Sequence, residues 1–267
     1  MNPSLFLMVF AGYFISFILY FMNFELQKES LYIWARGAAF FSLWGHLVFL
    51  LSAFLRIGHF AVGNLSEYIQ MGSFLILLAS FATETQGKAK FLMLFSLPIV
   101  LIFCLFAILL AEQKNVAFSA PGSGWLWFHT SFILAGFSSL IIAVSSAIMY
   151  LLQSSQIKSK HLGKVFLKLP SLNALDRLHF ASLAWGVILF SLGMLTGVFW
   201  AKTTKELHQV LKDPTVILSF LTCFMYWVIL SFRFSSLRRG QKIAVSTVLV
   251  FVLLFLTVIT SNYAPTG

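Results

Sequence analysis

Charged residues are scarce in this sequence, and acidic residues are the scarcest of them. Only 10% of the 267 residues are charged, and Asp and Glu together number 8, whereas soluble domains usually carry about 25% charged residues. Hydrophobic residues make up 60% of the chain and include 31 Phe and 7 Trp. A soluble globule of this size could not bury so much apolar surface. The composition therefore excludes an ordinary soluble domain and indicates an integral membrane protein.

Cysteines and the common catalytic motifs are lacking as well. The only two cysteines, Cys104 and Cys223, each lie in an apolar run and form no CxxC pair, so we interpret them as small apolar residues. The sequence contains no Walker loop, no HExxH and no GxSxG pattern. An ATPase or a hydrolase therefore has no support.

Long apolar runs occupy nearly the whole chain. A membrane-spanning helix needs about 20 mostly apolar residues, and long runs without alternation favour helices over the strands of a membrane barrel. The first run has no basic start and is too long for a signal-peptide core, so we interpret it as a span. We expect an all-α, polytopic transmembrane helix bundle that forms a single membrane domain over residues 1–267. Its eight expected spans are roughly 3–22, 32–55, 68–83, 91–111, 126–152, 178–201, 215–232 and 243–260.

The 18 basic residues are divided unevenly between the loops that join these runs. If the amino terminus lies outside, 13 of them fall on the inner side and 5 on the outer side (13 + 5 = 18). Because Lys and Arg accumulate in cytoplasmic loops, we expect both termini outside, in the cytoplasmic membrane of the cell. The net charge of +10 then reflects topology in a lipid bilayer and not nucleic-acid binding. The inner set is Lys28, Arg36, Lys88, Lys90, Lys158, Lys160, Lys164, Lys168, Arg177, Arg233, Arg238, Arg239 and Lys242, and the outer set is Arg56, Lys114, Lys202, Lys205 and Lys212.

Two of the six histidines stand out by their positions. His46 falls near the middle of the second span, where an unpaired ionisable group is costly, so we expect a neutral ring that faces the bundle interior. Neutral imidazole is a good axial ligand for haem iron, but a hydrogen bond to a neighbouring helix carbonyl would also explain this residue. His129 opens the fifth span at the outer face, next to Trp125 and Trp127. These two Trp residues are typical of an interfacial aromatic belt, which is the alternative to a binding role for His129.

The other polar candidates are weaker. His59 and His208 lie in outer loops and could reach a ligand, whereas His161 and His179 lie on the inner side and are expected to be unremarkable in function. Glu67 suits the first turn of a helix that Asn64 or Ser66 could cap. Asp213 before Pro214 is typical of a helix start, with Asp as the cap. The spans show no obvious buried carboxylate, which argues against a proton-coupled transporter.

Several segments resemble, in the right order, the cytochrome c assembly family, which includes CcsA-, CcmC- and HemX-type proteins. The outer loop of CcsA proteins usually reads GHFPxxNxYE, and an LPSLxxLD run, a GxxxGxxWA motif, a WDP and a helix-ending Arg follow it. The matching segments here are Arg56–Phe60 with Asn64–Glu67, Leu169–Arg177, Gly193–Ala201, Asp213–Pro214 and Arg233. Together they extend the resemblance from about Arg36 to Thr260.

The resemblance implies haem handling by histidines, because four histidines are implicated in the fuller members of the family. His46 matches the first intramembrane histidine, and His129 matches the first outer one. Ser231 stands where the second intramembrane histidine would be, and the tail after Thr260 has no histidine. The stretch 202–214 also lacks the Trp residues of the family pattern WGxxWxWDP. By the resemblance, the haem contacts would come from His46 and His129 as axial ligands, with His208, His59, Trp200 and Asp213 nearby.

Three functions remain open. The leading hypothesis is a haem-binding or haem-translocating component of cytochrome c biogenesis, which works with other assembly proteins and apocytochrome c and is an accessory factor more than a self-sufficient enzyme. The second is a HemX-type regulator of tetrapyrrole synthesis, whose basic inner loop 153–177 contacts a soluble enzyme. The third is an unrelated transporter. A visible spectrum of the purified protein discriminates the first from the second.

Overall fold

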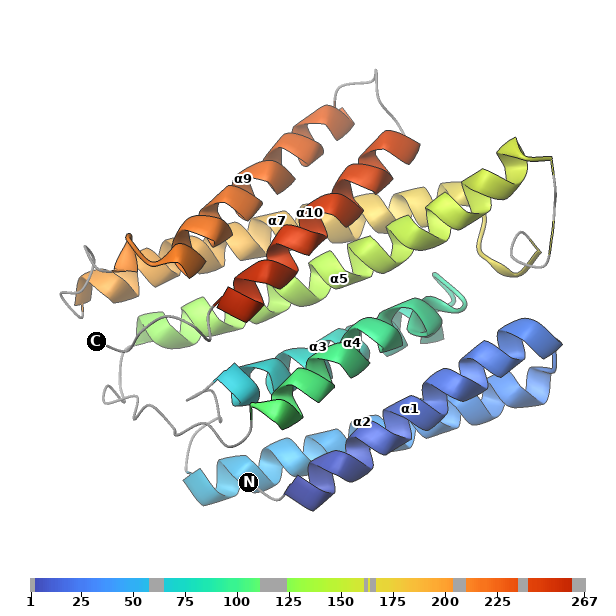
Figure 1. Ribbon diagram of the computed structural model, residues 1–267, viewed down its shortest axis with the longest axis horizontal. Coiled ribbons are helices and arrows are strands. Elements are labelled where there is room, and N and C mark those ends of the chain that lie inside the picture. Colours follow the sequence, from blue (N-terminus) through green and yellow to red (C-terminus); the bar gives the residue numbers. More distant parts are fainter. Residues whose placement is uncertain are drawn as a thin grey trace. The chain divides into compact units, whose positions relative to one another are not determined.

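The computed structural model describes residues 3–57, 65–110, 124–160, 163, 167–203, 210–234 and 240–260. All regular elements in these ranges are α-helices, which confirms the expected all-α class (Figure 1). Seven of them are long and apolar enough to cross a membrane, and α10 contains a shorter apolar stretch over 241–257. The helices are α1 (Pro3–Leu26), α2 (Glu29–Ile57), α3 (Leu65–Thr85), α4 (Leu92–Leu109), α5 (Gly124–Lys158), α7 (Leu172–Thr203), α9 (Pro214–Phe234) and α10 (Gln241–Thr260).

Each helix matches one expected span, but most of them extend beyond the apolar run. α5 has 35 residues and α7 has 32, more than the bilayer core requires. The third helix has 21 residues, so its short apolar run understated its length. The reason is that backbone hydrogen bonds, not apolar side chains, define where a helix ends. Polar residues such as Glu84 continue the helix beyond the run that the sequence marks.

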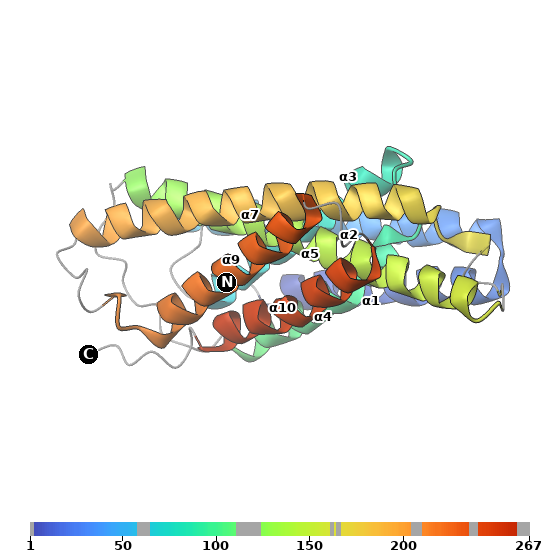
Figure 2. The ribbon, with the colours of Figure 1, turned by 90° about the horizontal axis from the view of Figure 1, so that it is seen from above.

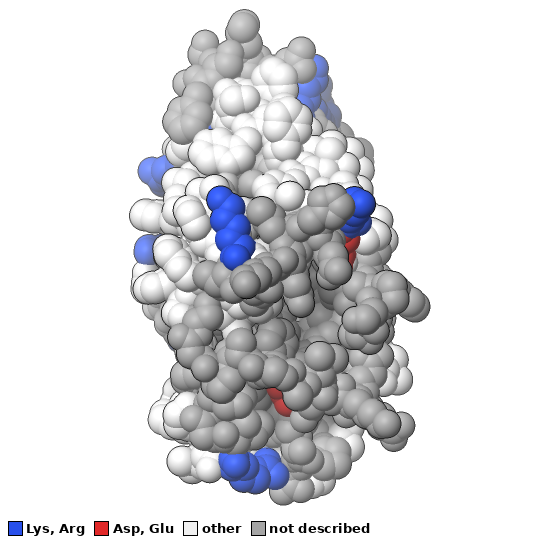
Figure 3. Space-filling model, turned by 90° about the vertical axis from the view of Figure 1, so that its left-hand side faces the viewer, with Lys and Arg blue, Asp and Glu red and all other residues white. Residues whose placement is uncertain are grey.

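Large apolar side chains cover the outside of the helices. Leu55 is 80% exposed, Phe41 74% and Trp34 69%, which in water would be an aggregation hazard and in lipid is the expected surface. Charged side chains on the described surface in Figure 3 are a few separate lysines and arginines and still fewer acids. The chain is therefore a multi-pass membrane protein.

The chain divides into two compact units, which are described separately here, and the single domain expected from the sequence stays a prediction. Residues 1–118 and 160–170 form unit 1, which contains α1 to α4. In this unit α1 packs on α2 and α4, and α3 packs on α4 and α2. The four helices thus form a ring in which α1 and α3 are the diagonal pair, and their facing sides line the interior.

Unit 2 comprises residues 119–159 and 171–267 and contains α5, α7, α9 and α10. α5 and α7 run side by side over most of their length, and α10 packs on α5 and α9 (Figures 1 and 2). Glycines allow the close approach of α5 and α7: a Cβ on Gly136 would lie 2.6 Å from the Phe190 nitrogen, and one on Gly193 would lie 2.6 Å from Ile133. Small residues at such a crossing are the usual means of packing helices in a membrane.

Candidate functional site

His46 lies in the interior of unit 1, as its sequence position predicts. The side chain is completely buried, and its Nδ1 is 3.0 Å from the hydroxyl of Tyr13 on α1. Phe6, Phe49 and Phe74 surround the ring, with ring centroids 5.6, 6.2 and 5.5 Å from that of His46. The expectation that this histidine faces the bundle interior is therefore confirmed.

The second nitrogen of His46 is the one that could hold a ligand. Among the described residues, Nε2 of His46 has no hydrogen-bond partner, and an unsatisfied buried polar atom calls for an explanation. A phenol can accept as well as donate, so Nδ1–H can donate to Tyr13 and leave the lone pair on Nε2. Such a hydrogen bond from the other ring nitrogen is the usual way in which a ligating histidine is oriented. The Tyr13–His46 pair therefore fits the axial coordination of haem iron.

His129 lies in the first turns of α5, in unit 2, and its tautomer is fixed by α7. Its Nδ1 is 2.7 Å from the carbonyl oxygen of Gly193. A carbonyl can only accept, so Nδ1 carries the proton, and in the neutral imidazole Nε2 carries the lone pair. The imidazole also stacks on Trp200, with ring planes 17° apart and centroids 6.4 Å apart. Among the described residues no hydrogen bond involves Nε2 of His129, so in the neutral imidazole this nitrogen can act as a ligand.

The GxxxGxxWA segment of α7 forms the surface on which the His129 ring packs. Thr196 Oγ1 also donates to the Gly193 carbonyl, at 2.9 Å, so two side chains contact this oxygen. A Cβ on Gly197 would lie 2.7 Å from His129 Nδ1, which shows that only glycine leaves room for the ring. Gly193, Gly197 and Trp200 of one sequence motif therefore position one histidine.

The remaining predicted site residues fall into two groups. His59 and His208 lie outside the described residues, as do His161 and the tail after Thr260. Asp213 caps α9, since the Thr215 N–H donates to its Oδ1 at 2.7 Å, and this confirms the helix start predicted there. Ser66 is not a cap, because it lies inside α3 and donates to the Ala107 carbonyl. Ser231, in the place of the second intramembrane histidine, is exposed and bonded to its own helix.

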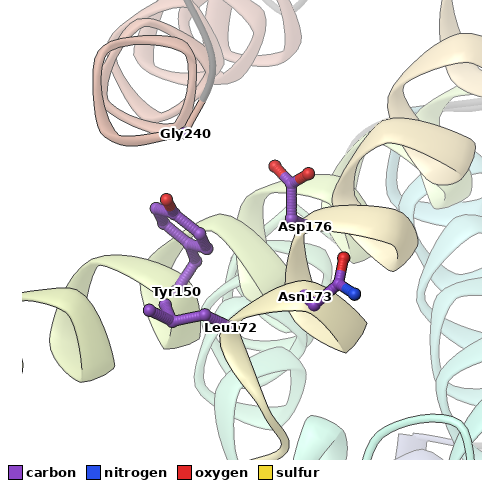
Figure 4. A pocket seen from close by; sticks show the side chains of 5 residues that line it. All are labelled: Tyr150, Leu172, Asn173, Asp176 and Gly240. Carbon is purple, nitrogen blue, oxygen red and sulfur yellow. The ribbon is translucent and has the colours of Figure 1, made fainter.

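The LPSLxxLD segment lines a pocket of about 230 Å³ (Figure 4). This pocket lies at the start of α7, whereas His129 contacts Gly193 near the end of the same helix. Asp176 forms an ion pair with Arg233, which joins α7 to the last turn of α9. The Asp176 carboxylate and the Tyr150 hydroxyl both point toward the turn at Gly240 (Figure 4). Gly240 has a φ of 85°, and a Cβ there would meet the Tyr150 hydroxyl. His179, expected to be unremarkable, is buried next to this pair and lies 3.0 Å from Thr247.

Sequence reasoning missed that both glutamates of α3, Glu67 and Glu84, are buried. Glu84 at the end of α3 is only 4% exposed and accepts hydrogen bonds from Tyr20, Tyr32 and the Met93 N–H. The expectation that the spans hold no buried carboxylate is therefore wrong. A signal was present in α1, where Tyr13, Ser16, Tyr20 and Asn23 recur at a spacing of three and four residues, which places them on one helix face.

The described residues contain no group of three or more His, Cys, Asp or Glu that could hold a bare metal ion. Haem needs only one or two axial ligands from the protein, because the porphyrin supplies the other four. One correctly oriented imidazole per site, as at His46 and at His129, is therefore sufficient for haem and insufficient for a zinc or iron ion alone.

Comparison with known proteins identifies the family of this chain. The sequence model of the family described as cytochrome C assembly protein matches residues 62–267. The cytochrome c biogenesis protein CcsA of Prochlorococcus marinus (strain MIT 9301) is 24% identical over 233 residues, which cover 79% of this chain and 75% of that protein. CcsA of Guillardia theta is 23% identical over a match that covers 95% of this chain and 90% of that protein. The protein HemX of Bacillus subtilis (strain 168) is 24% identical over a match that covers 91% of this chain and 89% of HemX. The chain therefore belongs to the cytochrome c assembly protein family.

Proposed function

We propose that this membrane protein binds haem as cargo through His46 and His129 during cytochrome c biogenesis. The observation that carries the proposal is the contact of His129 Nδ1 with the Gly193 carbonyl oxygen at 2.7 Å, which in a neutral imidazole leaves the lone pair on Nε2. An imidazole held in this way offers Nε2 to an iron atom without a proton to lose and without a ring to reorient. The haem iron supplies the redox chemistry.

His46 and His129 would serve two separate haem positions. His46 lies in a buried aromatic surrounding in mid-span, which suits the apolar macrocycle. His129 lies at the helix end that the charge distribution places outside, where haem could be presented to apocytochrome c. His59 and His208 belong to outer loops by the same topology, and either could complete the coordination at His129.

The test is the visible spectrum of the purified protein with added haem. We expect His129→Ala to abolish the outer haem, His46→Ala to abolish the intramembrane haem, and His208→Ala to weaken the outer haem or shift its spectrum. His179→Ala is the matched control, because His179 is also a buried histidine of unit 2 with a single side-chain partner. An unchanged Soret band in His129→Ala would exclude the outer site.

A HemX-type regulatory role is the second candidate, and the elements of the CcsA pattern that this chain lacks favour it. HemX covers 91% of this chain, and the chain lacks the Trp-rich stretch and two of the four histidines implied by the resemblance to CcsA. On this alternative the inner loop 153–177 contacts a soluble enzyme of tetrapyrrole synthesis. A protein that carries no haem, but that co-purifies with such an enzyme through this loop, would support it.

A further inference from the structure

Unit 1 contains more buried polar groups than the binding of haem at His46 requires. On α1, Tyr13, Ser16 and Tyr20 are fully buried, and Asn23 is 4% exposed. On α3, Ser73, Ser80 and Glu84 are 1%, 0% and 4% exposed. Because α1 and α3 are the diagonal helices of the ring, these two polar stripes line the same interior. An apolar interior would be the cheaper way to fill a bundle in lipid.

Glu84 forms one end of this polar interior. Tyr20 of α1 donates to its Oε1 at 2.8 Å, and Tyr32 of α2 donates at 3.0 Å. The Met93 N–H of α4 donates to Oε2 at 3.0 Å, so the carboxylate is held by three neighbouring helices. The guanidinium of Arg36 lies 5.6 Å from the centre of the Tyr32 ring and adds a positive charge to this end. A buried ionisable group in a membrane span marks a functional site by default.

The other end lies at the level of His46. There Tyr13 meets His46, and Ser73 lies beside the thiol of Cys104 on α4. Cys104 is fully buried. On α3, eleven residues separate Ser73 from Glu84, which corresponds to about 16 Å along the helix.

The Ser80 hydroxyl divides this distance along α3 into two parts. Ser80 lies one helical turn from Glu84, about 6 Å away along the axis, and seven residues, about 10 Å, from Ser73. On α1, Ser16 lies between Tyr20 and Tyr13 and donates to the Ala35 carbonyl at 2.9 Å, so its oxygen can still accept. Among the described residues, the Ser80 hydroxyl and His46 Nε2 have no partner. Buried polar atoms left in this state are typically satisfied by internal water, which makes about three hydrogen bonds at such sites.

We propose that unit 1 holds a file of internal water molecules between Glu84 and the level of Cys104, through which protons exchange from the Glu84 end. Each hydroxyl along the file accepts a proton from one neighbour and gives another to the next, so no oxidant or further reactant is needed. This inference goes beyond haem binding and holds for the haem-free protein. Leu77 is fully buried between Ser73 and Ser80 on the same face of α3. The longest distance between hydroxyl groups that water must bridge on α3 is therefore the one beside Leu77.

Cys104 provides a native probe of this file. The S–H stretch of a thiol lies in a spectral window free of other protein bands and shifts when the proton is replaced by deuterium. Cys223→Ala removes the only other thiol, which belongs to unit 2. The experiment transfers the haem-free Cys223→Ala protein into D₂O. Exchange of the Cys104 thiol is followed by the S–H stretch, and exchange of the α4 amides is followed by mass spectrometry.

We expect the thiol to exchange well before the amides of α4, because water reaches it without opening of the helix. Ser80→Val and Glu84→Gln should each slow the thiol at least about tenfold while the amide rates stay unchanged, which also shows that the variants are folded. Ser96→Val is the matched control, since Ser96 is buried in the same unit and bonded to the Leu92 carbonyl of its own helix, and its thiol rate should equal that of the parent. Thiol and amides exchanging together would overturn the proposal, as would equal thiol rates in Ser80→Val, Glu84→Gln and the parent, or an equal slowing by Ser96→Val.

Discussion

Gly197→Ala tests whether the packing of His129 on the GxxxGxxWA segment of α7 orients this histidine as a ligand. The added Cβ would lie 2.7 Å from Nδ1 and 2.9 Å from Cε1 of His129. Ordinary van der Waals contact begins near 3.4 Å, so the ring must move away by about 0.7 Å (3.4 − 2.7). A shift of this size along the hydrogen bond would lengthen the distance from Nδ1 to the Gly193 oxygen from 2.7 Å to about 3.4 Å, where little of the bond remains.

The expected loss follows from that hydrogen bond. Removal of the group that orients a ligating histidine typically reduces metal affinity about 10- to 100-fold, which is about 1.4 to 2.7 kcal/mol. We therefore expect Gly197→Ala to weaken haem binding at His129 by this factor without removing the histidine itself. Haem titration followed by the Soret absorbance, in a His46→Ala background that isolates the outer site, measures it.

Gly37→Ala is the matched control for this substitution. Gly37 also lies in a membrane helix, but a Cβ there would meet no atom within 4 Å, so its haem affinity should equal that of the parent. If Gly197→Ala titrates like Gly37→Ala, the Gly193 carbonyl does not set the ligand, and the tautomer argument fails.

Three further outcomes are expected from the structure. Tyr13→Phe removes the partner of His46 Nδ1, so it should lower the free energy of unfolding by about 1–3 kcal/mol and weaken haem binding at His46. The buried hydroxyl of Tyr226 has no partner among the described residues, so Tyr226→Phe should leave thermal unfolding nearly unchanged. Equal melting temperatures of the two variants would contradict this prediction. Asp176→Asn breaks the ion pair with Arg233 and, because both side chains are partly exposed (23% and 15%), should cost about 1–3 kcal/mol, measured by thermal unfolding; no loss would show that the pair is not stabilising. A cysteine in place of Lys160 should resist labelling from outside intact cells, and ready labelling would reverse the topology.

The sequence predicts the helices well and their facing sides poorly, for a physical reason. Eight apolar runs mark eight helices because each span must be apolar over the bilayer thickness. Lipid and protein interior are equally apolar, so the hydrophobic pattern does not tell which side of a helix is buried. The residues that do tell are small or polar ones, such as the glycines of α7 and Ser16 and Tyr20 of α1. Glu84 was missed because it lies just beyond the apolar run 68–83, where the hydrophobic pattern no longer marks the helix.

The candidate site could be located from the sequence but not assembled. His46 and His129 were found because, among the six histidines, their positions in the expected spans stand out in a chain with few polar groups. What qualifies them as ligands are contacts with Tyr13, 33 residues before His46, and with Gly193, 64 residues after His129. Contacts over such separations depend on how the helices pair, which a single sequence does not specify.

The two histidines share a feature that bears on the missing ligands of the family pattern. In each, Nδ1 is bonded to a group of a neighbouring helix, and no described residue forms a hydrogen bond with Nε2. Ser231, at the place of another ligand, bonds to the Val228 carbonyl of its own helix and offers a hydroxyl, which is a poor ligand for haem iron. A haem at His46 would therefore have one strong protein ligand among the described residues. One histidine ligand is enough to hold haem, as the proximal histidine of globins and peroxidases does, so the histidines absent here do not argue against haem binding at His46 or His129.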